Sequence, residues 1–283
     1  MMQSPPADQH EPHELEEHDR GLVYDLNTLD RRRVLKLLGF GGLSAGLFTL
    51  VGCGPNGATG SASAASAATD ATGASCAFVP EETAGPFPGD GSNGPNILAE
   101  SGVVRSDIRS SFGSSTTVAE GIPLAIQLTV QDAECAPLAG AAVYLWHCDR
   151  DGNYSMYSDA AAGENYLRGV QEADDTGLVT FRSIFPACYQ GRWPHIHFEV
   201  YPSLETANDE ANKIATSQIA LPKDACDTVY ATQGYEQSVQ NLSRLSLQTD
   251  MVFADDGGVH QLGTMSGDVA GGYAVRLTVA VNG

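Results

Sequence analysis

Positive charge is scarce in this chain of 283 residues. Lys and Arg together number 15 against 35 Asp and Glu, which gives a formal net charge of −20. A surface with this imbalance repels the phosphates of nucleic acids and of anionic lipids. We therefore expect no nucleic-acid partner, and we expect the acidic surface to serve solubility.

A long apolar run is also missing. The most apolar stretch, residues 37–51, is too short and too rich in glycine to be a good membrane-spanning helix. Asp30-Arg31-Arg32-Arg33 precedes it, and Leu50-Val51-Gly52-Cys53 ends it. This order of arginines, apolar residues and cysteine resembles a bacterial twin-arginine export signal with a lipobox. It predicts export of the folded protein by the twin-arginine route and a lipid anchor at Cys53, on the outer face of the membrane.

The composition divides the chain into four parts. Residues 1–30 are acidic and polar without an apolar period, which predicts a disordered leader. The export signal with its lipobox occupies residues 31–53. Residues 54–75, rich in Gly, Ala, Ser and Thr, have the composition of a flexible linker. One folded domain is expected over residues 76–283.

Short β-type segments separated by Gly, Pro and Asp fill this last part, and several of them alternate apolar with polar residues. The predicted strands cover residues 124–130, 142–147, 178–182, 195–201, 214–221 and 273–281, and one or two short helices are expected within residues 224–241. Regularly spaced short strands predict an all-β fold, a β-sandwich of mixed or antiparallel strands with few short helices.

The cysteines of the folded part are odd in number. Those that follow Cys53 are Cys76, Cys135, Cys148, Cys188 and Cys226. An exported location permits disulfides, and an odd number leaves at least one cysteine unpaired. Because Cys135 and Cys148 flank a predicted hairpin turn at residues 137–140, a bridge between these two is expected.

The segment His195-Ile196-His197 lies in a predicted strand. Alternate side chains of a strand share one face, so the two imidazoles can hold two neighbouring positions on one metal ion. Tyr189 lies six residues before His195 in a loop, and Tyr154 lies just past an Asp-Gly turn. A loop tyrosine between polar neighbours has no packing role, which favours a functional one.

Two tyrosines and two histidines restrict the choice of metal. The phenol group has a pKa near 10, so only a strongly charged, hard ion ionises it at neutral pH. Zinc and copper more often bind thiolates, carboxylates or additional imidazoles. Two phenolates cancel most of the charge of Fe(III). The set therefore indicates a non-haem Fe(III) cofactor.

Six segments of the chain are similar, in order, to the intradiol ring-cleavage dioxygenases, which include the catechol 1,2- and protocatechuate 3,4-dioxygenases. The resemblance covers about residues 76–221 and is carried by Thr83-Ala84-Gly85-Pro86-Phe87, Arg105-Ser106-Asp107-Ile108-Arg109, Leu145-Trp146-His147-Cys148, Gly152-Asn153-Tyr154-Ser155, Leu167-Arg168-Gly169-Val170-Gln171 and Pro194-His195-Ile196-His197. It implies Fe(III) bound by Tyr154, Tyr189, His195 and His197. Tyr189 and His195 would be axial, and the other two would be equatorial.

The resemblance also implies a reaction, the cleavage of a catechol by O2 to a cis,cis-muconate-type dicarboxylic acid. Tyr189 would leave the iron with a proton from the substrate, Arg192 would offset negative charge on the ring, and Gln218 would lie near the ring-cleavage intermediates. Only five residues separate Tyr189 from His195, where the catechol 1,2-dioxygenases have a long insertion. Part of the substrate-pocket wall is therefore missing or replaced, and the identity of the catechol stays open.

Two functions of other classes compete with this interpretation. A copper/zinc superoxide dismutase is also a β-sandwich with a His-x-His pair, but it needs more histidines than the four that follow Cys53, which are His147, His195, His197 and His260. A non-catalytic, exported β-sandwich that binds a ligand or a partner remains the alternative. The oligomeric state is open.

Other residues near these segments are expected to be structural. We expect Trp146 in the core and His147 with its ring nitrogens satisfied. Tyr144, Tyr157 and Tyr166 are expected to pack or to line a pocket wall. An ion pair is expected for Arg168.

Overall fold

The computed structural model describes residues 76–282. The predicted leader, export signal and linker over residues 1–75 lie outside the described residues. Within residues 76–282, no helix has the length and apolar character needed to cross a membrane.

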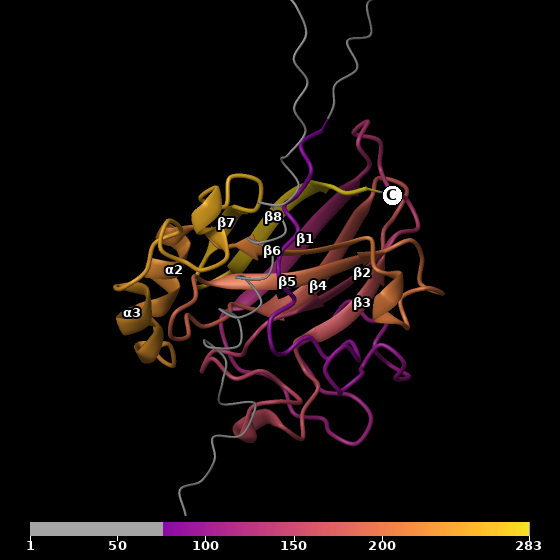
Figure 1. Ribbon diagram of the computed structural model, residues 1–283. Helices are drawn as coiled ribbons and strands as arrows, with labels where there is room; N and C mark the ends of the chain where they lie inside the picture. The colour runs from indigo at the N-terminus through magenta and orange to yellow at the C-terminus, as the bar shows by residue number, and fades with distance from the viewer. Residues whose placement is uncertain (1–75, 283) are drawn as a thin grey trace, which may run out of the picture.

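Two four-stranded sheets form the body of the protein (Figure 1). The first sheet has the order β4 (Leu178–Ile184), β1 (Pro123–Gln131), β8 (Gly272–Ala280) and β7 (Thr264–Asp268). The second has the order β3 (Arg168–Glu172), β2 (Ala142–Trp146), β5 (His195–Tyr201) and β6 (Ala215–Ala220). The pair β1–β8 is parallel and the other pairs are antiparallel. The predicted all-β sandwich of mixed strands is confirmed.

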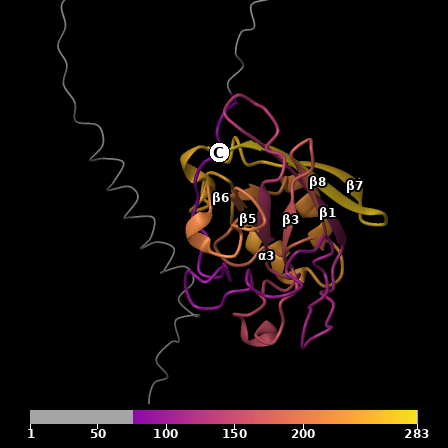
Figure 2. The same ribbon diagram turned by 90° about the vertical axis from the view of Figure 1, so that its right-hand side faces the viewer.

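The two sheets form separate layers, which Figure 2 shows with β5 and β6 on one side and β1, β8 and β7 on the other. In β1, every second residue from Leu124 to Val130 is buried, and the residues between them are partly exposed. The apolar side chains of this alternation pack in the main core with Val143 of β2 and Phe198 of β5. The sandwich core therefore lies between the sheets, as the period of two predicts.

The second sheet is buried on both faces, because all residues of β2, β5 and β6 are buried. One face of β2 joins the main core. The other face carries Tyr144 and Trp146, which belong to a second apolar cluster with Tyr154. Loops and the N-terminal part of the described chain cover this outer face.

Two short helices, α2 (Lys223–Tyr230) and α3 (Glu236–Leu242), lie together at one end of the sheets (Figure 1). They confirm the helices expected within residues 224–241. The structure adds two strands that were not predicted. β3 begins with a buried arginine and a glycine, and β7 is almost wholly exposed, so neither shows the alternation that marks a half-buried strand.

The expected bridge between Cys135 and Cys148 is wrong. Cys135 forms its disulfide with Cys76, and Cys148 is a free, buried cysteine. Cys135 lies before β2 and Cys148 lies after it, so the five extended residues of β2 lie between them. Five extended residues span about 16 Å, far more than the distance of about 4.4–6.8 Å between the Cα atoms of a disulfide. The start of the described chain instead runs beside Cys135, where the Cys76 amide donates to the Ala133 carbonyl at 3.1 Å.

Candidate metal centre

Four donor atoms meet on the outer face of the second sheet. His195 Nε2 lies 3.0 Å from His197 Nε2, 3.4 Å from Tyr154 Oη and 3.3 Å from Tyr189 Oη. The two phenol oxygens are 3.5 Å apart. The structure thus brings together all four of the predicted iron ligands, although Tyr154 is 41 residues from His195 in the sequence.

Strand β5 places the two histidines. Both side chains point away from the sandwich core, and His197 pairs with Trp146 of β2 on one side and Gln218 of β6 on the other. The His197 ring stacks on Trp146 with centroids 4.8 Å apart and planes 6° from parallel. His195 Nδ1 lies 2.6 Å from the Trp193 carbonyl, to which it can only donate. In the neutral ring this bond leaves His195 Nε2 without a proton, as a metal ligand requires.

A tight turn after β2 places Tyr154. The Asp149 carboxylate accepts the amides of Asp151 and Asn153, each at 2.9 Å. Gly152 has φ +91°, which favours glycine, and a side chain there would meet the Cβ of Tyr189 at 3.2 Å. The turn can therefore pass close to the second tyrosine, and the two phenol rings meet edge to face with centroids 5.9 Å apart.

The donor set fits a single transition-metal ion. Nitrogen and oxygen ligands lie about 2.0–2.2 Å from such an ion, so neighbouring donors are about 3 Å apart. In residues 76–282 no group of three or more His, Cys, Asp or Glu side chains could hold a metal, so the phenol oxygens are needed to complete the set. His197 Nδ1 is buried without a hydrogen-bond partner, which leaves Nε2 as the polar atom that orients this ring.

Burial controls the protonation of these ligands. It lowers the pKa of His195 to about 3, with the Arg192 charge adding to the effect, and it holds the pKa of His197 well below the usual value. Both imidazoles are therefore neutral and able to bind a metal at neutral pH. Burial raises the pKa of Tyr154 well above that of a free phenol, so a strong positive charge is needed to ionise it.

Arg192 lies beside the donors as a buried cation. Its Nε donates to Asp250 Oδ2 at 3.1 Å, and its Nη2 donates to Gln218 Oε1 at 2.6 Å. Burial alone would lower the pKa of Arg192, but the interactions with Tyr189, Asp250 and Tyr154 raise it beyond the usual value. The guanidinium is therefore a fixed positive charge next to both tyrosines.

Gln218 links Arg192 to the N-terminal part of the described chain. It lies opposite His197 on β6, and its Nε2 donates to the Thr83 carbonyl at 3.0 Å. The structure thus places Arg192 and Gln218 beside the four donors, where the sequence comparison with the family expects them.

Asp250 is a residue of the site that the sequence analysis did not predict. It is fully buried, and besides Arg192 its carboxylate accepts the amides of Trp193, Val252 and Phe253. Although burial favours the protonated acid, Arg192 and the Trp193 amide hold the pKa of Asp250 below its usual value. Asp250 belongs to no motif and lies 58 residues after Arg192, so the sequence carries no local signal for it.

Most of the residues expected to be structural are structural. Trp146 is in the core, and the ring nitrogens of His147 lie 2.7 Å from the Cys148 carbonyl and 2.6 Å from Ser183 Oγ. The expected ion pair of Arg168 is wrong. No carboxylate of residues 76–282 pairs with it, because backbone carbonyls and hydroxyls surround its guanidinium.

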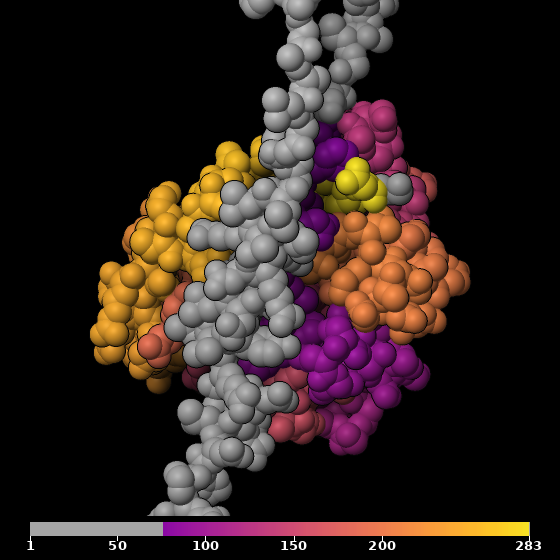
Figure 3. All heavy atoms as spheres, in the orientation of Figure 1, coloured from indigo at the N-terminus to yellow at the C-terminus, as the bar shows by residue number. Residues whose placement is uncertain are grey.

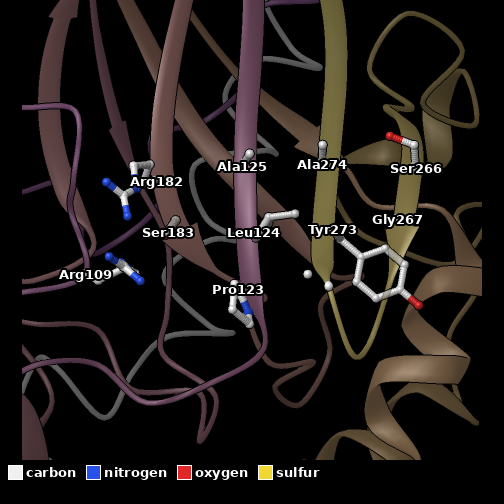
Figure 4. Close-up of a pocket in the computed structure, with 12 residues that line it drawn as sticks. Arg109, Pro123, Leu124, Ala125, Arg182, Ser183, Ser266, Gly267, Tyr273 and Ala274 are labelled. Carbon is white, nitrogen blue, oxygen red and sulfur yellow. The ribbon is translucent and has the colours of Figure 1, made fainter.

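A hollow of ≈ 370 Å³ lies elsewhere, on the first sheet (Figure 4). Arg109 and Arg182 border it on one side and Tyr273 on the other. None of the four donors lines it, so its size does not make it the site of the chemistry.

Comparisons with known proteins find relatives for the part of the chain that carries the site. A protein-family model described as "Dioxygenase" matches residues 93–224, a range that holds the four donors, Arg192 and Gln218. A chlorocatechol 1,2-dioxygenase of Rhodococcus opacus is 37% identical over 62 residues, which are 22% of this chain and 24% of the relative. A catechol 1,2-dioxygenase of Candida albicans is 38% identical over 60 residues, which are 21% of this chain and 20% of the relative.

The chain therefore spans about a quarter or less of the length of these curated relatives. A solved structure gives wider coverage. The intradiol ring-cleavage dioxygenase from Tetranychus urticae superposes with a TM-score of 0.59 at 25% identity, over 73% of this chain and 95% of that chain. The family model, the curated relatives and this solved structure therefore all support the intradiol ring-cleavage dioxygenase family for this chain.

Proposed function

We propose that this protein is a non-haem Fe(III) enzyme that cleaves a catechol between its two hydroxyl-bearing carbons. O2 is the second substrate, and the product is a cis,cis-muconate-type dicarboxylic acid. Catechol and O2 together contain all the atoms of the product, so no separate reductant is needed. The observation that carries this proposal is the convergence of the four side chains: His195 Nε2 lies 3.0–3.4 Å from the donor atoms of His197, Tyr154 and Tyr189, and the two phenol oxygens are 3.5 Å apart.

Iron in this site would supply a Lewis acid that binds the diol and the redox chemistry that O2 requires. The chain supplies the surroundings. Burial holds the two imidazoles neutral, and the bond to the Trp193 carbonyl fixes the tautomer of His195. The donors lie on a sheet face that loops cover, so bulk water is largely kept from the reacting ring.

The two tyrosines have different surroundings and therefore different roles. Tyr154 is buried, whereas Tyr189 is partly exposed in its loop. Tyr189 is thus the one that can move, and as a phenolate its oxygen would accept a proton from an incoming catechol hydroxyl and become a neutral phenol. Tyr154 stays in place with the two histidines.

Arg192 acts as a fixed charge rather than as a proton donor. Its guanidinium is held by Asp250 and Gln218 before any substrate arrives. A preorganised positive charge in a buried site stabilises negative charge that develops on the substrate ring, without reorganisation during the reaction. Gln218 holds the guanidinium and, with its other end, the chain that passes over the site.

Purified protein tests the proposal. Elemental analysis should find stoichiometric iron, and the visible spectrum should show the charge-transfer band of phenolate bound to Fe(III). Oxygen uptake with catechol, protocatechuate, hydroxyquinol and chlorocatechols should identify the substrate. Iron-free, colourless protein that consumes no O2 with any of the four would refute the proposal and leave the non-catalytic binding protein.

We also propose that the enzyme is exported by the twin-arginine route and anchored at Cys53, which rests on the sequence of residues 31–53 alone. Replacement of Arg31, Arg32 and Arg33 by lysine should keep the protein inside the cell. Cys53→Ser should release the exported protein from the membrane fraction. Membrane attachment that survives Cys53→Ser would refute the anchor.

A further inference from the structure

Arg168 is a buried cation without a carboxylate partner. It opens β3, and only 1% of it is exposed. Its Nε donates to Ser155 Oγ at 3.0 Å, and its Nη2 donates to the Ser155 carbonyl at 2.9 Å. Burial of a charge without a counter-charge costs free energy, so the hydrogen bonds of this guanidinium must offset that cost.

The remaining bonds of the guanidinium reach a different segment. Nη2 also donates to the Phe87 carbonyl at 3.0 Å, and Nη1 donates to the Pro88 carbonyl at 2.8 Å and to Tyr144 Oη at 3.1 Å. We call residues 83–89 the strap. One side chain thus joins the strap to the turn that carries Tyr154.

The strap passes directly over the donors. A side chain on Gly85 would lie 3.5 Å from His197 Cε1, and the Phe87 ring lies 5.0 Å from the Tyr154 ring, centroid to centroid. Gln218 holds the start of the strap at the Thr83 carbonyl. Arg168 holds its end, where a side chain on Gly89 would come within 2.9 Å of Nη1.

We propose that Arg168 is a positioning residue, which fixes the strap and the Tyr154 turn relative to each other and so sets the wall and one ligand of the site together. This inference rests on the proposed function. The planar guanidinium presents five N–H groups in a fixed fork, and its five bonds go to four residues on two segments and a strand. A carboxylate partner would occupy that fork and would add negative charge beside Tyr144 and Tyr157, which both contact the guanidinium.

Arg168→Lys is the decisive variant, because it keeps the charge and removes the fork. We expect amide exchange of the peptide 82–89, measured on metal-free protein, to rise about tenfold as the strap loses charged hydrogen bonds. In iron-loaded protein, the charge-transfer band should shift and kcat/KM for the preferred catechol should fall about tenfold, mainly through KM. Wild-type exchange and a wild-type band in Arg168→Lys would overturn the inference.

Arg105→Lys is the matched control. Arg105 is also a partly buried arginine whose guanidinium donates to backbone carbonyls, namely those of Ser110, Asn165 and Arg168, and its side chain bonds neither the strap nor the Tyr154 turn. This variant should leave the strap exchange and the visible band unchanged. Equal changes in both variants would show a general loss of structure and would overturn the specific role of Arg168.

Ser155→Ala covers the case in which Arg168→Lys does not fold. It removes one of the five bonds, that from Arg168 Nε, and should raise strap exchange in the same direction by a smaller factor. Unchanged strap exchange in a folded Ser155→Ala protein would overturn the inference. Wild-type protein without iron would refute the proposed function, whereas the exchange measurements on metal-free protein would still decide the role of Arg168.

Discussion

Asp250→Asn should destabilise the protein and free the Arg192 side chain from its ion pair. The two carboxylate oxygens of Asp250 accept hydrogen bonds from different groups. Oδ2 accepts Arg192 Nε at 3.1 Å and the Trp193 amide at 2.6 Å, and Oδ1 accepts the amides of Val252 at 2.9 Å and Phe253 at 3.1 Å. Asparagine has one acceptor oxygen. In either orientation its NH2 group faces two N–H donors.

The cost follows from this geometry. Two buried donors lose their acceptor, and each unsatisfied buried group costs about 1–3 kcal/mol. The Arg192–Asp250 pair is also lost, with side-chain exposures of 3% and 0%. Removal of one partner of a buried ion pair costs about 3–5 kcal/mol, because the other charge stays buried. These are two views of the same loss, so we expect the free energy of unfolding to fall by about 3–5 kcal/mol.

Urea unfolding followed by near-UV circular dichroism measures this change. Asp107→Asn is the control. Asp107 also pairs with an arginine, Arg109, through both of its oxygens, but the two side chains are 38% and 33% exposed, so its loss should cost less than about 1 kcal/mol. A free energy of unfolding for Asp250→Asn within about 1 kcal/mol of wild type would refute the reasoning.

The same pair has a defined pH dependence. The pKa of Asp250 is held below its usual value by Arg192 and the Trp193 amide, against the effect of burial. Its contribution to stability is therefore fully present above the ordinary carboxyl pKa of about 3.9. The contribution is lost as the pH falls through the lower pKa of the folded state. The difference between wild type and Asp250→Asn should be constant near neutral pH and should shrink below about pH 4.

Four further predictions concern the ligands, Arg192 and the disulfide. Tyr189→Phe should bleach much of the visible band and slow turnover, while Tyr166→Phe should keep the colour; an unchanged spectrum would remove Tyr189 from the ligand set. His197→Ala should abolish iron binding, which full iron occupancy by elemental analysis would contradict. Arg192→Ala should keep the band but lose most activity, and normal turnover would show a structural role only. Cys76→Ser should lower the free energy of unfolding by about 2–4 kcal/mol, since the disulfide closes a loop of 59 residues; unchanged urea unfolding would mean that the bridge does not form.

Local patterns explain what the sequence could predict of the fold. β1 alternates buried with partly exposed residues, and β5 is rich in β-branched and aromatic residues. Both features are typical of strands, along which side chains have a two-residue period. β3 does not show that pattern, because contacts with other parts of the chain determine where this strand forms. Its Gly169 lies where a side chain would come within 2.6 Å of Ile108, and its Arg168 is buried by the strap. Such a strand is defined by its neighbours rather than by its own residues.

The site divides in the same way. His195 and His197 are predictable from one strand, and the tyrosines from their turns, because each lies within a short motif. The disulfide of Cys76 with Cys135 and the bond of Asp250 to Arg192 join residues 59 and 58 positions apart. No periodicity or spacing encodes such contacts, which follow only from the path of the chain around the sheets.

Strand β5 shows how one alternation serves both stability and function. Ile196, Phe198 and Val200 point into the sandwich core. The opposite face carries the two histidines and then Glu199, which is fully buried and whose pKa burial raises to about 7. Polar side chains on a face of this kind can be buried away from water only if other parts of the chain provide their hydrogen bonds.

The covering segments do this. Lys213, which follows β5, binds Glu199 at 3.2 Å and Asp90 at 3.4 Å. Asp90 directly follows the strap, and the two segments border each other on the surface in Figure 3, where the N-terminal described segment is purple and the part after β5 is orange. Arg168, Gln218 and Lys213 thus all hold the N-terminal segment against one strand face. Substitutions that loosen this segment should therefore change the metal site before they change the sandwich core, because the core lies on the other side of β5.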